Sequence, residues 1–280
     1  MIIDIHTHTF PEHMAAKVID KLSRLSRSIP FTDGTLDGLR QSMDDADIDR
    51  SIVLPVATNA HQVEHINDSS ARICETQSDV ISFGCMHPAF TNYVDELSRI
   101  VRLGLKGIKI HPVYQETDID DIKFLRIFDR AAELGLIVVT HAGLDIGFPG
   151  VVRCSLTMIR RVVDRIGNFK LIAAHMGGWR NWDEALEMLA DTSVMIDTAF
   201  STGMIVPRGD AQWLESDLKM LDADQFMKFV KAFGADRIIF GTDSPWSDQA
   251  TSKKFIEQLP INEDCRKKIL GDNAARLLNL

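Results

Sequence analysis

Four histidines and one aspartate are the residues of this chain best suited to chemistry. Each closes a short apolar run typical of a β-strand, although the runs lie far apart in the sequence. The five residues are His6, His8, His141, His175 and Asp243. Imidazole and carboxylate groups bind divalent ions, and separate strand ends bring them together only where the strands share one rim. The pattern therefore predicts a metal centre at the rim of a barrel.

The first strand carries the clearest part of this pattern, because it ends in His6-Thr-His8. Alternate residues of a strand point to the same side, so the two imidazoles project together from α-carbons about 6 to 7 Å apart. Histidine pairs also arise by chance, and any one strand-end His or Asp can instead cap a helix or satisfy a backbone group. Five such residues, each at the end of a predicted strand, favour a metal site over chance placement.

Length and composition describe a globular enzyme. The 280 residues are 45% hydrophobic and 25% charged, which is consistent with one (β/α)8 barrel or with two ordinary domains. The net charge of −9 offers no basic stripe for a nucleic-acid backbone. The chain has no secretory signal pattern at its start, and no apolar run approaches the roughly 20 residues that cross a bilayer. We expect a soluble cytoplasmic protein that binds neither nucleic acid nor membrane.

The cysteines give no sign of a zinc ribbon or of a disulfide framework. Cys74, Cys85, Cys154 and Cys265 are scattered and form no CxxC pair. Buried free thiols in a reducing cytoplasm are the simpler interpretation.

Short β-branched runs alternate with longer amphipathic segments, the pattern of a parallel sheet with crossover helices. Stretches such as 120–134 and 182–190 place apolar residues at helical spacing, 11–48 is long enough for two helices, 198–222 forms another long connection, and 262–280 predicts terminal helices. The eight candidate strands are 2–8, 51–56, 80–86, 106–111, 136–141, 170–175, 193–197 and 237–242. Eight strands with intervening helices predict an α/β fold, a distorted (β/α)8 TIM barrel. Without a linker or repeat, residues 1–280 are expected to form one domain.

The strand ends also carry motifs of a known family. The matching pieces are Asp4-Ile-His-Thr-His-Thr-Phe-Pro11, Gly107-Ile-Lys-Ile-His-Pro112, Thr140-His-Ala-Gly143, Ala174-His-Met-Gly-Gly178, Phe240-Gly-Thr-Asp-Ser-Pro245 and Gly271-Asp-Asn-Ala-Ala-Arg-Leu-Leu278. In these pieces the chain resembles the amidohydrolase superfamily, in the branch that includes aminocarboxymuconate-semialdehyde decarboxylase, resorcylate decarboxylases and pyrone-dicarboxylate lactonase.

This resemblance implies a single divalent ion, usually zinc in that branch, held by His6, His8, His141 and Asp243. Three imidazoles and one carboxylate neutralise only one unit of the ion's charge, so the pKa of a bound water falls toward about 7. By the same resemblance His175 lies beside that water as the general base, and Asp243 shares proton transfer.

Lys109 and His111 leave a second arrangement open, because they share strand parity. Other branches of the superfamily carboxylate a lysine at this strand end and use it to bridge two metals. The alternatives are a substrate contact or buried ion pair for Lys109 and a hydrogen-bonded rim position for His111.

Further residues near the strand ends are candidates for the substrate pocket. Phe10, Trp179 and Trp246 can line an apolar pocket or pack in the core. Asp197 resembles a family position near the substrate and can equally act as an N-cap. One of Arg153, Arg180 and Arg208 is expected to grip an anionic substrate, and the sequence does not distinguish them.

These observations favour an enzyme that hydrolyses a small cyclic amide, lactone or ester through a metal-activated water. The first alternative keeps the site but decarboxylates an unsaturated or aromatic carboxylic acid without oxidation. The second is a catalytically inactive, metal-dependent binding protein. The expected partner is a small molecule with a carboxylate group, and the resemblance implies a homodimer.

Overall fold

The computed structural model describes residues 1–209 and 213–280. Its chain divides into two compact units. Unit 1 comprises Met1–Ile52, Ile146–Pro149 and Asp197–Leu280, and unit 2 comprises Val53–Asp145 and Gly150–Ile196. Among the described helices, none has the length and apolar character needed to cross a membrane.

Unit 2 is built on parallel strands whose carboxyl ends lie at one edge of a sheet. Five strands of a six-stranded sheet belong wholly or mostly to unit 2: β4 (Gly84–Cys85), β5 (Gly107–Ile110), β6 (Ile137–Thr140), β7 (Leu171–Ala173) and β8 (Met195–Asp197). In register, Ile110 pairs with Thr140, Thr140 with Ala173, and Ala173 with Ile196. The residues that directly follow β5, β6 and β7 therefore emerge side by side, as the sequence pattern predicts.

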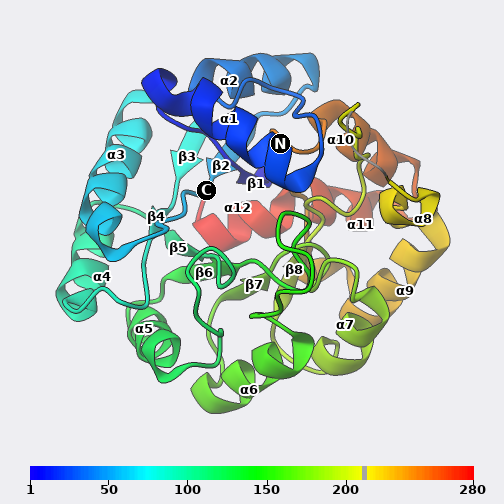
Figure 1. Ribbon diagram of the computed structural model, residues 1–280. Coiled ribbons are helices and arrows are strands. Elements are labelled where there is room, and N and C mark those ends of the chain that lie inside the picture. The colour runs from blue at the N-terminus through cyan, green and yellow to red at the C-terminus, as the bar shows by residue number, and fades with distance from the viewer. Residues whose placement is uncertain (210–212) are drawn as a thin grey trace. The chain divides into compact units, whose positions relative to one another are not determined.

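Amphipathic helices separate the strands of unit 2, as Figure 1 shows for α4, α5 and α6. Helix α5 buries Phe124, Ile127, Phe128 and Ala131, the spacing of one helical face. It begins after Asp121, whose side chain accepts from the Lys123 N–H as an N-cap. The helices of this unit are η1 (Ala60–Gln62), α3 (Val63–Thr76), α4 (Tyr93–Arg102), α5 (Ile122–Glu133), α6 (Leu156–Ile166) and α7 (Trp182–Leu189).

Unit 1 is organised around β1 (Ile3–Thr7), in which every residue is buried. The Ile5 N–H donates to the Phe240 carbonyl (3.0 Å), which joins β1 to the segment after β9 (Ile238–Ile239). On its other edge the Thr7 hydroxyl donates to the carbonyl of Ile52 in β2 (Arg50–Val53) at 2.9 Å. The helices are α1 (Glu12–Ser26), α2 (Leu36–Asp45), α8 (Glu215–Leu218), α9 (Ala223–Phe233), η2 (Ala235–Arg237), α10 (Gln249–Gln258), α11 (Glu263–Lys267), η3 (Lys268–Asp272) and α12 (Asn273–Leu278).

Among the described residues, the predicted elements are found, with one difference in the strands; residues 210–212 of the predicted connection 198–222 lie outside the described residues. The run 80–86 forms two short strands, β3 (Val80–Ser82) and β4, which belong to different sheets. Segment 11–48 holds α1 and α2, and 262–280 holds three helical segments, as expected. Of the predicted buried thiols, Cys85 and Cys154 are buried, whereas Cys74 and Cys265 are half-buried and all four are free. The single-domain organisation stays a prediction.

Candidate metal centre

The end of β1 places His6 and His8 beside the loop that carries Asp243. His6 is fully buried within the strand, and His8 follows it and is half-buried. The Asp243 N–H donates to the His6 carbonyl (2.8 Å), and the His8 N–H donates to the Ser244 carbonyl (2.7 Å). Asp243 has a φ of 69°. A left-handed backbone costs a non-glycine residue about 1–3 kcal/mol and is concentrated at functional sites, so this strain also marks the loop.

Three donor atoms of these side chains lie at nearly equal distances. His6 Nε2 is 3.2 Å from both His8 Nε2 and Asp243 Oδ1, and His8 Nε2 is 3.1 Å from the same oxygen. Donors about 2.0–2.1 Å from a tetrahedral ion stand about 3.3 Å apart, and donors about 2.2 Å from an octahedral ion stand about 3.1 Å apart. The triangle therefore fits a divalent ion of either geometry.

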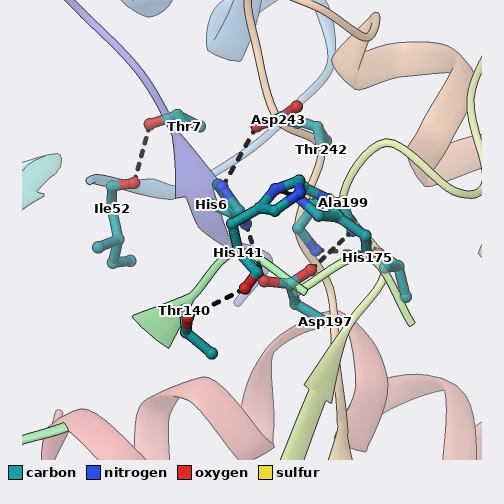
Figure 2. A network of polar contacts seen from close by, with 12 residues as sticks. His6, Thr7, Ile52, Thr140, His141, His175, Asp197, Ala199, Thr242 and Asp243 are labelled. Atoms are coloured by element: carbon teal, nitrogen blue, oxygen red, sulfur yellow. Dashed lines mark hydrogen bonds and ion pairs between the residues drawn. The ribbon is translucent and has the colours of Figure 1, made fainter. Parts of the chain in front are cut away.

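Asp197 determines which nitrogen of His6 faces this triangle. Its Oδ2 lies 2.8 Å from His6 Nδ1, and both side chains are fully buried (Figure 2). An ionised carboxylate only accepts, so Nδ1 carries the ring proton and Nε2 of the neutral ring presents its lone pair. That lone pair and Asp243 Oδ1 repel unless a positive charge lies between them, either a second ring proton or a metal ion. A carboxylate behind a histidine is the usual support of a metal-ligating imidazole.

Asp4 links the strand to the Asp243 loop from behind. It precedes His6 by two residues and accepts from the Thr242 N–H (3.0 Å), the Thr242 hydroxyl (2.5 Å) and Gln249 Nε2 (2.7 Å). Burial raises the pKa of Asp4 to about 7, and these hydrogen bonds oppose the rise. The network attaches β1 to the residue directly before Asp243, which fixes the relative position of two candidate ligands.

In unit 2, His141 follows β6 and His175 follows β7. His141 Nδ1 is 3.0 Å from His175 Nε2, and His141 Nε2 is 3.0 Å from the Leu144 carbonyl oxygen. A carbonyl only accepts, so His141 Nε2 carries the proton and Nδ1 of the neutral ring accepts. His175 Nε2 is then the donor of the imidazole pair. His175 has a φ of 62°, a second left-handed residue among the candidates.

A further buried group lies beside His141. The ring of His111 stacks on Tyr114 (centroids 4.0 Å apart) and on His141 (4.4 Å). Asp145 Oδ2 is 3.4 Å from His111 Nε2 and 3.9 Å from His141 Nε2. By residue type, His111, His141 and Asp145 resemble the unit 1 triangle.

Gln115 holds the backbone that carries His111. Its Oε1 accepts from the His111 N–H (3.0 Å), while its Nε2 donates to the carbonyls of Ala57 (3.0 Å) and Met86 (2.6 Å). One buried amide thus satisfies three backbone groups at the carboxyl ends of neighbouring strands.

Lys109 lies inside β5 and is only 1% exposed. In register it neighbours Cys85 of β4 and Val139 of β6. Burial raises the pKa of Cys154 to about 12, although the Lys109 charge opposes the rise, so this thiol stays protonated at neutral pH. Both the carboxylated, metal-bridging lysine and the substrate contact stay predictions.

The aromatic candidates differ in their packing. Trp179 is 7% exposed, and its backbone pairs with the segment after β6 through the Ala142 and Leu144 backbone groups. Phe10 and Trp246 are half-buried. The Phe10 N–H donates to the Gly34 carbonyl (2.8 Å). Trp179 is thus more buried than Phe10 and Trp246, and the role of all three in a substrate pocket stays a prediction.

The three arginine candidates have different partners. Arg153 Nη1 is 2.9 Å from Asp118 Oδ1. Arg180 lies over the Trp179 ring at 5.0 Å, and Arg208 Nη1 donates to the Ser23 hydroxyl at 3.3 Å. Which of them meets a substrate stays a prediction.

Comparison with known proteins shows the family. A family model described as amidohydrolase matches residues 3–280. A 2-amino-3-carboxymuconate-6-semialdehyde decarboxylase of Dictyostelium discoideum is 25% identical over 247 residues, which cover 78% of this chain and 66% of that protein. The chain thus spans slightly less than two thirds of the relative's length.

Two solved structures show the same fold. An uncharacterized TIM-barrel protein from Bordetella bronchiseptica superposes with a TM-score of 0.75 at 17% identity, over 99% of this chain and 98% of that one. A dihydroxybenzoic acid decarboxylase from Polaromonas sp. JS666, with bound manganese and the inhibitor 2-nitroresorcinol, gives a TM-score of 0.70 at 16% identity, over 100% and 97%.

The chain belongs to the amidohydrolase family, and its fold is the TIM-barrel fold. Both the resemblance seen in the sequence and the predicted fold class are confirmed. The predicted membership of the amidohydrolase superfamily is thus confirmed, and the activity as a hydrolase or as a decarboxylase stays a prediction.

Three further residues contact the candidate site residues or the backbone that carries them: Asp4, Gln115 and Asp145. The sequence motifs include Asp4 but assign it no role, and they do not include Gln115 or Asp145. Asp4 shares strand parity with His6, a signal that was available. Gln115 and Asp145 follow strand ends in loops, where no periodicity marks a functional side chain.

Proposed function

We propose that this chain is a metal-dependent, non-oxidative decarboxylase of an unsaturated or aromatic carboxylic acid. The observation that carries the proposal is the triangle of His6 Nε2, His8 Nε2 and Asp243 Oδ1, with edges of 3.1–3.2 Å. Asp197 holds the proton of His6 on the opposite ring nitrogen, so the triangle is built from atoms that can ligate a cation.

The comparisons support decarboxylation, which the sequence placed second, over hydrolysis. The Dictyostelium relative is named for the decarboxylation of a carboxymuconate semialdehyde, and the Polaromonas structure is named for that of a dihydroxybenzoic acid. Both names describe an unsaturated or aromatic acid. The substrate class proposed for this chain follows from them.

The assignment of His141 as a fourth ligand stays a prediction. A divalent ion held by His6, His8 and Asp243 would supply positive charge that orients the substrate carboxylate and stabilises the negative charge that develops as carbon dioxide leaves.

His175 is proposed to move the proton. In decarboxylation the bond between the substrate carbon and its carboxylate breaks, the electron pair stays on that carbon, and the carbon takes up one proton. The imidazolium form of His175 is the proposed source, because it becomes a neutral imidazole when it gives up one ring proton. The ring regains its proton from water, so the reaction is balanced without an oxidant.

Hydrolysis of a cyclic amide, lactone or ester is the second candidate, because the matching family model is described as amidohydrolase. His175 then accepts a proton from water instead of donating one. The identity of the ion as zinc stays a prediction, and the Polaromonas structure contains manganese. A single ion per chain, the homodimer and the cytoplasmic location also stay predictions.

The test compares the two reactions on one protein. The purified protein is stripped with a chelator, reloaded with zinc or manganese, and assayed against hydroxylated benzoic acids, a carboxymuconate analogue, and a panel of lactones and cyclic amides. We expect metal-dependent release of carbon dioxide from one of the acids. Turnover of lactones or amides without carbon dioxide release would select hydrolysis, and activity unaffected by metal removal would contradict the proposed centre.

A further inference from the structure

Thr198 directly follows β8, the strand that ends in Asp197, and its two oxygens serve different segments. The Thr198 carbonyl accepts from the Ser201 N–H (3.2 Å), so it belongs to the turn that leaves the strand. The Thr198 hydroxyl accepts from the Gly241 N–H (3.0 Å) and donates to the Gly241 carbonyl (2.8 Å). One fully buried side chain therefore satisfies both backbone groups of a residue 43 positions away in the sequence.

Gly241 is connected to two candidate ligands. Along the chain it lies two residues before Asp243, and the intervening Thr242 accepts on its carbonyl from the Phe200 N–H at 3.1 Å. Through space, a β-carbon added at Gly241 would lie 3.0 Å from the β-carbon of His6, which is closer than side chains normally pack. The glycine thus lets His6 lie directly against the backbone that leads to Asp243. A shift of Gly241 would move the surroundings of both side chains.

The turn that contains Thr198 is itself bonded to His6. Asp197 Oδ2 is 2.8 Å from His6 Nδ1, and Asp197 Oδ1 accepts from the Ala199 N–H at 3.1 Å (Figure 2). The residues on both sides of Thr198 are therefore held by the carboxylate that supports this imidazole. Because the Thr198 hydroxyl bonds the turn to Gly241, it links the support of one candidate ligand to the segment that carries another.

We propose that Thr198 is a positioning residue of the metal centre, whose hydroxyl maintains the 3.2 Å spacing between His6 Nε2 and Asp243 Oδ1. Thr198 acts through Gly241 and not by contact with the ion. The inference rests on the proposed function for the presence of an ion, and its cause lies in the contacts of unit 1. Valine has the shape of threonine without the hydroxyl, so Thr198→Val removes this partner from two buried backbone groups at once.

The test compares Thr198→Val with Thr198→Ser, which keeps a hydroxyl, and with Thr192→Val as the matched control. The Thr192 hydroxyl also joins two backbone groups, because it donates to the Leu189 carbonyl (2.7 Å) and accepts from the Val194 N–H (3.2 Å). Thr192 lies in unit 2, just after α7. Both valine variants should therefore melt at a lower temperature than the unmodified protein, whereas only one of them changes the surroundings of the candidate ligands.

The readouts are metal affinity and ligand geometry, both measured without substrate on protein that circular dichroism shows to be folded. Competition with a chromogenic chelator gives the dissociation constant for zinc, and the absorption spectrum of the cobalt-substituted protein reports the geometry. We expect an affinity about 10–100-fold weaker and an altered cobalt spectrum in Thr198→Val. Thr198→Ser and Thr192→Val should stay within about threefold of the unmodified protein.

Gly241→Ala keeps the proposal testable if Thr198→Val does not fold. This variant keeps both backbone groups that bond the Thr198 hydroxyl, and its methyl group presses on His6. We expect zinc affinity to fall by about tenfold or more, because the pressure moves one corner of the triangle.

Three results would overturn the proposal: an unchanged zinc affinity and cobalt spectrum in Thr198→Val, an equal loss of affinity in Thr192→Val, or an unchanged affinity in Gly241→Ala. Failure of the proposed metal centre gives a different pattern, because His8→Ala would then bind zinc as tightly as the unmodified protein. If only the role of Thr198 fails, His8→Ala loses affinity and Thr198→Val does not.

Discussion

Each unit contains a group of two histidines and one aspartate. The group is His6, His8 and Asp243 in unit 1, and His111, His141 and Asp145 in unit 2. The groups differ in the partner that the protonated ring nitrogen of one histidine contacts. In unit 1, the Nδ1 of His6 is bonded to Asp197, so its Nε2 turns a lone pair toward His8 and Asp243. In unit 2, His141 Nε2 donates to a carbonyl beside Asp145. The same residue types therefore turn a ring lone pair toward a carboxylate in unit 1 and a ring N–H toward a backbone carbonyl in unit 2.

Removal of a candidate ligand is expected to give the largest effect. His8 is half-buried, so His8→Ala removes one corner of the triangle, and with it two of its three edges, without a large cavity. We expect metal affinity to fall by at least about 100-fold and turnover by about 1,000-fold or more, because two remaining ligands of unit 1 hold an ion poorly. Elemental analysis and steady-state kinetics measure both changes.

The matched control is His65→Ala, which removes an exposed histidine from α3. It should keep the metal content and activity of the unmodified protein. Full metal occupancy in His8→Ala would show that His8 does not hold the ion. The group in unit 1 would then no longer differ from the group in unit 2 as a metal site.

His175→Gln separates the proton carrier from the ligands. The change removes the titrating ring next to His141 Nδ1. We expect metal content to be retained and turnover to fall by about 100- to 10,000-fold, the usual contribution of general acid–base catalysis. A loss of metal as large as the loss of turnover in this variant would show that His175 is a ligand. Unit 2 would then also supply a metal-binding residue.

Much of the fold was predictable from local sequence, because β-branched runs and amphipathic segments are local signals. His6 and His8 were predictable together, since strand parity fixes their direction. The role of Asp197 was not predictable, because its contact with His6 joins residues 191 positions apart. Nor were the ring tautomers, which depend on the Leu144 carbonyl and other groups that carry no sequence signature.

Asp197→Asn tests the support behind His6. The asparagine keeps the shape, but its side chain is neutral and accepts more weakly from His6 Nδ1. We expect metal affinity to fall by about 10–100-fold, with the number of equivalents at saturation unchanged. Competition with a chromogenic chelator measures the dissociation constant, and elemental analysis counts the equivalents. An affinity that stays the same would show that the tautomer of His6 does not depend on Asp197.

The smallest expected effect concerns His87, an imidazole of unit 2 that follows β4 and is 8% exposed. Its Nδ1 accepts from the Ala89 N–H, and burial lowers its pKa below the ordinary value of about 6.5. The unfolded chain then binds more protons than the folded one, so this residue makes stability fall as the pH drops below about 6.5.

His87→Gln should reduce that loss of stability. Urea midpoints at pH 7.5, 6.5 and 5.5 measure it, and His61→Gln, at an exposed position of η1, is the control. An equally steep loss in His87→Gln and the unmodified protein would show that His87 protonates freely in the fold.

The most direct measurement of the central claim is anomalous scattering from crystals of the metal-loaded protein, collected at the zinc or manganese edge. We predict one peak in unit 1, about 2.0–2.3 Å from His6 Nε2, His8 Nε2 and Asp243 Oδ1. A metal-saturated crystal with no peak at this triangle, in which His8 Nε2 still contacts Asp243 Oδ1 directly, would contradict the account.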